Sequence, residues 1–231
     1  MKGKLYGIGV GPGDPSLLTM KAKEIIESAD IVAVPVKKIG EASVALEIAK
    51  KAVDIPKSKI REIEFTMNKD KAKREECRKN AAKEVMALLD EDNTIAMLTL
   101  GDIGIYSTYA YVHKIIVDAG YDVEMVSGIP SFCAGASKAG ISLAEGNEGL
   151  GVIPSLKGID QVAKALDVFD NLVIMKVGNH VDEVCDLLKE RGLFENGVVV
   201  SNVGMEDEYV GPLIADRAYG YFTTIIVKKN L

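Results

Sequence analysis

Short apolar runs alternate along the chain with longer segments of helical periodicity, and this alternation limits the possible folds more than any other feature. The apolar runs cover residues 5–10, 31–36, 94–100, 123–126, 150–153, 172–177, 198–203 and 223–227. Runs of this length that are rich in Val and Ile predict buried strands. Strands that alternate with helices predict an α/β fold.

The segments between these runs carry apolar residues at helical spacing. Helices are expected around residues 18–29 and over 41–52, 71–89, 107–119, 131–139, 160–168 and 181–191. Asp14 is suited to cap the first of them, with Pro15 in its first turn. Gly120, Gly140 and Gly192 follow three others, where a residue that tolerates positive φ is favoured.

The segment VSGIPS at residues 126–131 is the best candidate for a domain boundary, because Gly128 and Pro130 interrupt the regular alternation. A chain of 231 residues suits one large domain or two smaller ones. We therefore expect two α/β domains, residues 1–127 and 128–231, that face each other across a cleft. Ligands usually bind in such clefts.

Charge and hydropathy exclude several classes of partner. The net charge of −6 argues against nucleic acid, whose binding relies on clustered positive charge. No window approaches the roughly 18 consecutive apolar residues of a membrane span, and the amino terminus does not resemble a signal peptide. These observations predict a cytoplasmic protein.

Cysteine and histidine usage predicts no metal site. Cys77, Cys133 and Cys185 are odd in number and far apart, so reduced thiols are expected. His113 lies within a helical pattern and His180 at a helix start, where packing or capping is favoured over catalysis.

A glycine-rich motif, GIGVGPGDP at residues 7–15, follows the first apolar run. A dinucleotide fingerprint that starts at Gly9 would need a third glycine at position 14, where this chain has Asp14. A carboxylate has the wrong charge for a place where phosphate rests on a helix amino terminus. The motif therefore predicts a ligand that is not held by its phosphates.

A second motif, TLGDIGIYSTYAYV at residues 99–112, places Gly101 and Asp102 at the end of a predicted strand. A carboxylate and free backbone groups would then point toward the cleft. From spacing alone, an ordinary turn capped by Ser107 or Thr108 explains this segment equally well.

Together the motifs GVGPGDP, LTLGDIGIYSTYAYV, VSGIPSFCAGASKAGISLAEGNEGLGVIPS and YFTTIIVKK resemble the tetrapyrrole methylase family, over nearly the whole chain and in the family's order. Within that family the chain is most similar to precorrin-2 and cobalt-precorrin-2 carbon-20 methyltransferases. One departure is Asp102-Ile103, where the family often shows Asp-Pro.

The resemblance implies a homodimeric enzyme that transfers a methyl group from S-adenosylmethionine to a small-molecule tetrapyrrole. The implied cofactor contacts are Val10, Gly101, Asp102, Ile105, Ser131, Phe132, Met175, Gly204, Met205 and Thr224. The implied substrate side of the cleft is formed by the opening loop, Gly9, Gly11, Pro12, Gly13 and Asp14. Glu145 and Glu148 are suggested to lie near the substrate by the same resemblance.

The chemistry suits these residue types, because the donor carries a sulfonium and an ammonium cation and can use carboxylate and carbonyl oxygens. Transfer to carbon requires the sulfur, methyl and acceptor atoms in line, so positioning is the main contribution expected. One proton must then leave the ring. Asp102 and Tyr106 are the candidate catalytic residues for that step.

A precorrin carries eight carboxylates, so an acidic protein must present local cations. The first-ranked candidates are Lys37, Lys38 and Lys176, ahead of Lys138 and Arg217, and an ordinary surface charge is the alternative for each. Three functions remain open: methylation of this or another tetrapyrrole, methylation of a modified histidine on a translation factor as in diphthine synthases, and binding of S-adenosylmethionine without catalysis.

Overall fold

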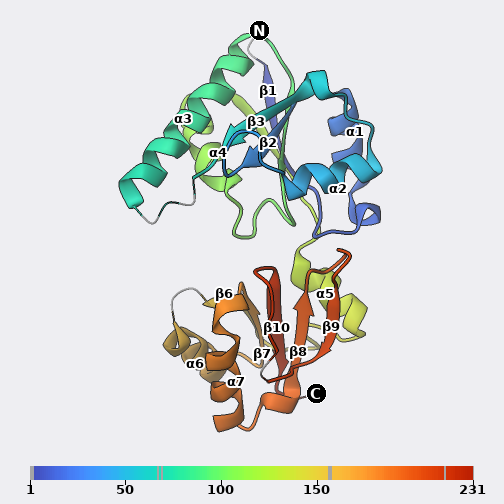
Figure 1. Ribbon diagram of the computed structural model, residues 1–231, viewed down its shortest axis with the longest axis vertical. Helices are drawn as coiled ribbons and strands as arrows, with labels where there is room; N and C mark the ends of the chain where they lie inside the picture. The colour runs from blue at the N-terminus through green and yellow to red at the C-terminus, as the bar shows by residue number, and fades with distance from the viewer. Residues whose placement is uncertain (1–2, 67, 69, 156–157, 216, 231) are drawn as a thin grey trace. The chain divides into compact units, whose positions relative to one another are not determined.

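The computed structural model describes residues 3–66, 68, 70–155, 158–215 and 217–230. The chain divides into two compact units, Met1–Pro130 and Ser131–Leu231 (Figure 1). Each unit combines a sheet with packed helices, so the expected α/β class is confirmed. Among the described residues, no helix is both long and apolar enough to span a membrane.

Unit 1 is built on a parallel sheet. In its described residues the strands are ordered β3 (Ile60–Glu64), β2 (Ile31–Val36), β4 (Ile95–Thr99), β1 (Lys4–Gly9) and β5 (Asp122–Val126). Because every strand runs in the same direction, the segments that follow β1, β2, β4 and β5 all emerge at one end of the sheet, here called the carboxyl end.

Helices cover both faces of this sheet. The helices of one face are α1 (Met20–Ser28) and α2 (Val44–Ala52), and those of the other are α3 (Lys71–Asp90) and α4 (Tyr109–Asp118). Along β2, Val32 and Val34 pack with α1 and α2, whereas Ile31 and Ala33 pack with α3 and α4. This alternation follows from the two-residue period of a strand and buries β2 on both sides.

Unit 2 has a mixed sheet. Its described strands are ordered β6 (Leu150–Pro154), β7 (Asn171–Met175), β10 (Thr223–Lys228), β8 (Gly197–Ser201) and β9 (Tyr209–Pro212). β10 is antiparallel to β7 and to β8, so Thr224 lies beside Met175 and Thr223 beside Ser201. The ends of β7 and β8 and the start of β10 therefore meet at one end of the sheet.

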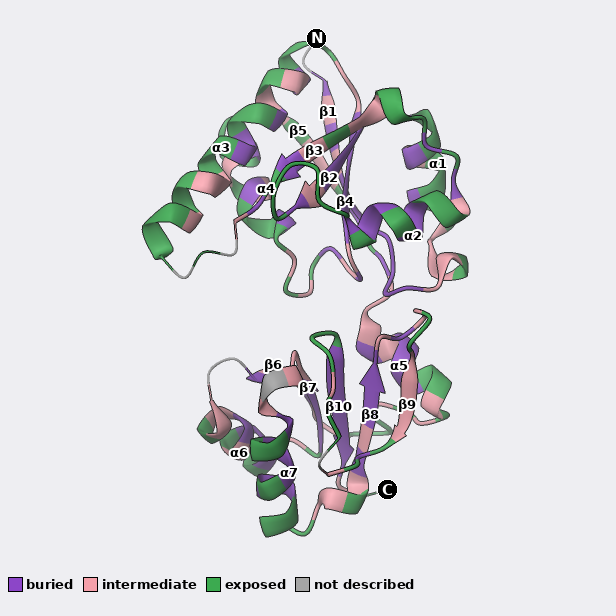
Figure 2. Cartoon of the chain, viewed as in Figure 1, coloured by how far each residue is buried: buried purple, intermediate pink, exposed green. Residues whose placement is uncertain are grey.

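Helices also cover both faces in unit 2. α6 (Ile159–Val168) and α7 (Val181–Glu190) share one apolar core with β7, β8 and β10. α5 (Ser131–Ala139) packs against β8, β9 and β10, and Gly135 lies directly against Val200. Figure 2 shows the same pattern in both units: the central strands are buried and the outer faces of the helices are exposed.

Two strands were not predicted, and both are edge strands. β3 and β9 bury few side chains, so neither produces the continuous apolar run that marks a central strand. The described residues also form four short 3-10 turns: Pro15–Leu17, Lys57–Lys59, Gly178–His180 and Phe194–Asn196.

The start of the first helix also differs from the prediction. The Asp14 side chain accepts a hydrogen bond from the Ser16 N–H and caps the 3-10 turn that begins at Pro15. α1 begins later, at Met20, with the Thr19 side chain as its cap. The glycines expected after helices behave as predicted, since Gly120, Gly140 and Gly192 all have positive φ.

Candidate active site

Four glycines bring the strand ends of unit 1 into backbone contact: Gly9, Gly11, Gly101 and Gly128. Gly11 N–H donates to the Gly101 carbonyl at 3.1 Å, and Gly101 N–H donates to the Gly11 carbonyl at 2.8 Å. A Cβ built on Gly9 would lie 2.6 Å from the Gly128 nitrogen and 2.7 Å from the Gly101 oxygen. Glycine is therefore required at position 9, because any side chain would separate the segments after β4 and β5.

Asp102 joins the same segments through its side chain. Its Oδ1 atom accepts the Gly104 N–H at 2.8 Å, and its Oδ2 atom accepts the Gly128 N–H at 3.0 Å. The first bond closes a local turn, whereas the second spans 26 residues of sequence. The carboxylate is half-buried at the carboxyl end of unit 1.

The opening loop is not arranged to hold phosphate. The Asp14 carboxylate accepts both the Ser16 N–H at 2.8 Å and the Ser16 hydroxyl at 2.7 Å. It therefore occupies the place where a phosphate would bind at this turn. Gly11, with φ of 81°, turns the backbone, and Gly11, Pro12 and Gly13 are all buried.

The other expected residues of unit 1 also follow strand ends. Tyr106 has φ of 49°, which is uncommon for a residue with a side chain, and its side chain is 46% exposed. Partial desolvation raises the pKa of the Tyr106 hydroxyl above its usual value. Lys37 and Lys38 follow β2 and are exposed. The Val10 side chain lies in the core, so a ligand could reach that residue only through its backbone.

In unit 2, the expected residues gather where β7, β8 and β10 meet. Met175 pairs with Thr224, and Gly204 and Met205 lie in the loop that follows β8. A Ser201–Thr223 hydroxyl contact of 2.9 Å and a hydrogen bond from Asn202 N–H to the Phe222 carbonyl hold this end of the sheet together. Ser131 and Phe132 begin α5 in the same unit.

Lys176 follows β7 with φ of 60°, and the buried Ser155 hydroxyl donates to its carbonyl at 2.9 Å. Desolvation lowers the pKa of the Lys176 ammonium. Backbone strain of this kind collects at functional sites. Asn202, which follows β8, is also at positive φ, so two such residues lie at this end of the sheet.

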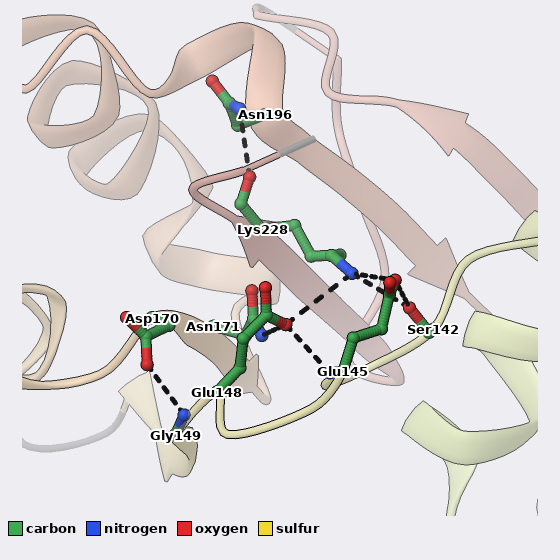
Figure 3. Close-up of polar contacts among 8 residues, drawn as sticks. All are labelled: Ser142, Glu145, Glu148, Gly149, Asp170, Asn171, Asn196 and Lys228. Atoms are coloured by element: carbon green, nitrogen blue, oxygen red, sulfur yellow. Dashed lines mark hydrogen bonds and ion pairs between the residues drawn. The ribbon is translucent and has the colours of Figure 1, made fainter.

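Glu145 and Glu148 lie at the other end of β10 (Figure 3). Lys228, the last residue of β10, contacts Glu145 Oε1 at 2.9 Å and Glu148 Oε2 at 3.9 Å. Register places Lys228 beside Asn171, four positions along β10 from Thr224. These glutamates therefore lie away from the sheet end that holds Met175 and Thr224, and their suggested place near the substrate stays a prediction.

The histidines have ordinary protein contacts. His113 Nδ1 lies 3.2 Å from the Tyr109 hydroxyl within α4, and His180 Nδ1 lies 3.4 Å from Glu183. None of the three cysteines forms a disulfide. Within the described part of the chain, no group of three or more His, Cys, Asp or Glu side chains is arranged to hold a metal ion.

Comparison with known proteins gives the family. Residues 4–214 match the family described as Tetrapyrrole (Corrin/Porphyrin) Methylases. The chain belongs to the tetrapyrrole methylase family. This confirms the resemblance seen in its sequence motifs.

Individual relatives of this tetrapyrrole methylase are similar over almost their full length. It is 41% identical to a probable cobalt-precorrin-2 C(20)-methyltransferase of Methanocaldococcus jannaschii, covering 98% of this chain and 96% of the relative. It is 32% identical to the cobalt-precorrin-2 C(20)-methyltransferase of Salmonella typhimurium, covering 100% and 98%. A uroporphyrin-III C-methyltransferase of Thermus thermophilus, solved with S-adenyl homocysteine, shares the fold with a TM-score of 0.69 at 18% identity, covering 99% of each chain.

Two features of this tetrapyrrole methylase were missed in the sequence. Gly128 was assigned only to a domain boundary. It follows β5, and Gly101 follows β4, so both glycines lie at the carboxyl end of the same sheet. A parallel sheet, had it been assumed, would have predicted that these two glycines lie near each other. Lys228 was also missed, because its partner Ser142 lies 86 positions away in the sequence.

Proposed function

We propose that this tetrapyrrole methylase transfers a methyl group from S-adenosylmethionine to carbon 20 of precorrin-2, in its cobalt form. The observation that carries the proposal is the 41% and 32% identity, over nearly whole chains, to relatives named for cobalt-precorrin-2 C(20) methylation. Their names also favour the cobalt-containing substrate over the metal-free one. Another ring carbon or another tetrapyrrole is the alternative within the same family.

The residues at the carboxyl end of unit 1 fit a cationic donor. When bound, S-adenosylmethionine supplies an electrophilic methyl group. Asp102 offers a carboxylate, and the backbone of Gly101 and of the opening loop lies close by. The Asp14 carboxylate occupies the position that a phosphate would need, which is compatible with a ligand that carries no phosphate.

We extend the proposal to the binding residues. In unit 1 the donor contacts would be Val10, Gly101, Asp102 and Ile105, and in unit 2 they would be Ser131, Phe132, Met175, Gly204, Met205 and Thr224. The support is that each residue lies at a strand end, in the loop that follows a strand, or at the start of α5. The opening loop, Lys37, Lys38 and Lys176 would hold the substrate and its carboxylates.

Methylation at carbon requires positioning first and proton removal second. The backbone of the glycine segments can approach a flat ring closely, because those residues have no side chain. The Asp102 carboxylate is already engaged by two N–H groups, whereas the Tyr106 side chain is half-exposed in the same loop between β4 and α4. We therefore favour Tyr106 over Asp102 as the group that assists loss of the proton.

Desolvation raises the pKa of Tyr106, so its hydroxyl is neutral at neutral pH. The hydroxyl oxygen would accept the proton that leaves the ring while the hydroxyl's own proton passes to solvent. Tyr106→Phe should lower the single-turnover rate at saturating donor by about 100-fold and leave donor affinity unchanged. Stopped-flow measurement with reduced precorrin-2 checks this. A variant that keeps the full rate would remove Tyr106 from the mechanism.

The proposed reaction can be tested directly by product analysis. The purified protein is incubated with S-adenosylmethionine carrying a 13C methyl group and with either cobalt-loaded or metal-free precorrin-2. We expect one label in the product, located at carbon 20 by NMR, with the cobalt form turned over faster. A label at another carbon would establish the alternative tetrapyrrole reaction, and donor binding without transfer would leave only a binding module.

We also propose a homodimer in the cytoplasm, as the family resemblance implies. No disulfide joins the three cysteines, which is compatible with a reducing compartment. Light scattering of the purified protein would measure the oligomeric state, and cell fractionation would locate the protein.

A further inference from the structure

The strand order of unit 1 raises a question about how its carboxyl end is held together. β1 lies between β4 and β5, so the segments that follow β4 and β5 are not neighbours in the sheet. The pairing of β1 with β5 ends at Ile8 and Val126. Beyond that pair, the Gly128 N–H donates to Asp102 Oδ2 instead of to β1.

We propose that Asp102 is a positioning residue whose carboxylate reaches across β1 and holds the segment after β5 against the segment after β4. Gly9 makes this reach possible, because a Cβ there would lie 2.6 Å from the Gly128 nitrogen. A Cβ on Gly128 would lie 2.2 Å from the Gly101 oxygen, so the segment after β5 can approach the segment after β4 only if residue 128 is a glycine. We call Gly9, Gly101, Asp102 and Gly128 the strand clamp.

The residue type follows from the hydrogen-bonding pattern. The two partners of the side chain are both N–H donors, so the side chain must accept a hydrogen bond at each of its two terminal atoms. An ionised aspartate does this with its two carboxylate oxygens. An asparagine would keep one acceptor and turn an NH2 group toward the other N–H. Bonds from N–H groups to a charged acceptor are also stronger than those to a neutral one.

The clamp has a consequence for the reaction, and this step rests on the proposed function. The segment that Asp102 holds, residues 127–130, leads directly into Ser131 and Phe132, which are proposed donor contacts. Asp102 would thereby restrict the movement of the segment that leads into these contacts, and so raise the affinity for the donor. This positioning effect would add to the direct donor contact proposed for Asp102, and neither role requires the carboxylate to take a proton.

The first test uses the protein without any donor. Amide hydrogen exchange at Gly128 is measured by NMR in wild type, in Asp102→Asn and in Gly9→Ala. We expect exchange to be about tenfold faster or more in each variant, and little further change in the double variant, because both substitutions open the same contact. Unchanged exchange at Gly128 in Asp102→Asn would overturn the clamp.

The second test separates positioning from proton transfer. The affinity for S-adenosylhomocysteine should fall about tenfold in Asp102→Asn, and the pH profile of the single-turnover rate should keep its shape. Unchanged affinity, together with loss of the acid limb of that profile, would instead make Asp102 the proton acceptor. If wild type binds no S-adenosylhomocysteine, the proposed function fails, while the exchange experiment still decides the clamp.

A matched control is available in unit 1. The Asp70 carboxylate also accepts two backbone N–H groups, from Ala72 and Lys73, at the start of α3. Asp70→Asn should leave both Gly128 exchange and S-adenosylhomocysteine affinity at wild-type values. A change of the same size in this control would show that the effect of Asp102→Asn is not specific to the clamp, and would count against it.

Discussion

At the scale of single residues, Lys228 shows how an ionised group is kept in a protein interior. Its side chain is only 7% exposed, and its ammonium lies 2.9 Å from both Ser142 Oγ and Glu145 Oε1. A buried charge without partners would be costly. The contacts tie the loop between α5 and β6 to the last residue of β10, over 86 positions of sequence.

The same cluster makes stability depend on pH. Hydrogen bonds from Ser142 and then Lys228 lower the pKa of Glu145, and a hydrogen bond from Asn171 is the main cause that lowers the pKa of Glu148. A carboxyl group whose pKa is lower in the folded state stabilises the fold above its unfolded pKa. That stability is lost as the pH falls through the folded pKa.

We therefore predict that Lys228→Met unfolds at a lower urea concentration than wild type at pH 7, and that the difference shrinks as the pH falls below about 4.5, the ordinary value for these carboxyl groups. Urea midpoints followed by circular dichroism from pH 7 to pH 3 measure this. A difference that stays constant over that range would show that the glutamates gain nothing from Lys228.

At the scale of elements, the packing of α5 on the unit 2 sheet depends on one missing side chain. A Cβ on Gly135 would lie 2.3 Å from Val200 Cγ1 and 2.6 Å from Val200 Cγ2. Val200 lies on the face of β8 opposite Val199, which belongs to the core beneath α6 and α7. Helix and strand therefore approach closely on a glycine rather than on interlocked side chains.

Gly135→Ala should accordingly destabilise unit 2 by about 1–3 kcal/mol through overpacking. Val200→Ala alone should also destabilise it by leaving a cavity, whereas the double variant should recover most of the loss. Urea unfolding of the four proteins gives the coupling. Losses that simply add in the double variant would contradict this packing.

Gly149→Ala is the matched control, since its new Cβ would meet nothing closer than 3.6 Å, an ordinary contact distance. We expect its urea midpoint to stay close to that of wild type.

At the scale of the whole molecule, charge is the property that bears on function. The net charge of −6 repels an anionic tetrapyrrole at long range, so lysines near the site must supply the attraction. Lys37 and Lys38 are exposed at the carboxyl end of unit 1, where salt can screen them. Charges attract each other over about 30 Å at 0.01 M salt but over only about 8 Å at 0.15 M, because salt screens them.

The double variant Lys37→Gln, Lys38→Gln should therefore lower kcat/KM for the tetrapyrrole by about fivefold at 0.01 M salt and by less at 0.5 M. Steady-state kinetics over this range provide the measurement, with Lys71→Gln in α3 as a control that removes a charge elsewhere in unit 1. A loss that is equal at low and high salt would exclude an electrostatic role for the two lysines.

The sequence by itself determined the α/β class, the central strands, most helices and the family. These depend on short-range information: the apolar runs of β1, β4 and β7, the glycines that end helices, and motifs read as continuous segments. The edge strands β3 and β9 were not predicted, because few of their residues are buried and neither strand has a continuous apolar run.

Only the tertiary structure decided which residues work together. Asp102 and Gly128 are 26 positions apart, and Lys228 and Ser142 are 86 apart; neither segment signals its partner locally. Strand order placed Asp102 within reach of Gly128 across β1, and strand register placed Glu145 and Glu148 at the opposite end of β10 from Thr224. Contacts of this kind arise because packing selects among many locally acceptable arrangements, and the selection depends on the whole fold.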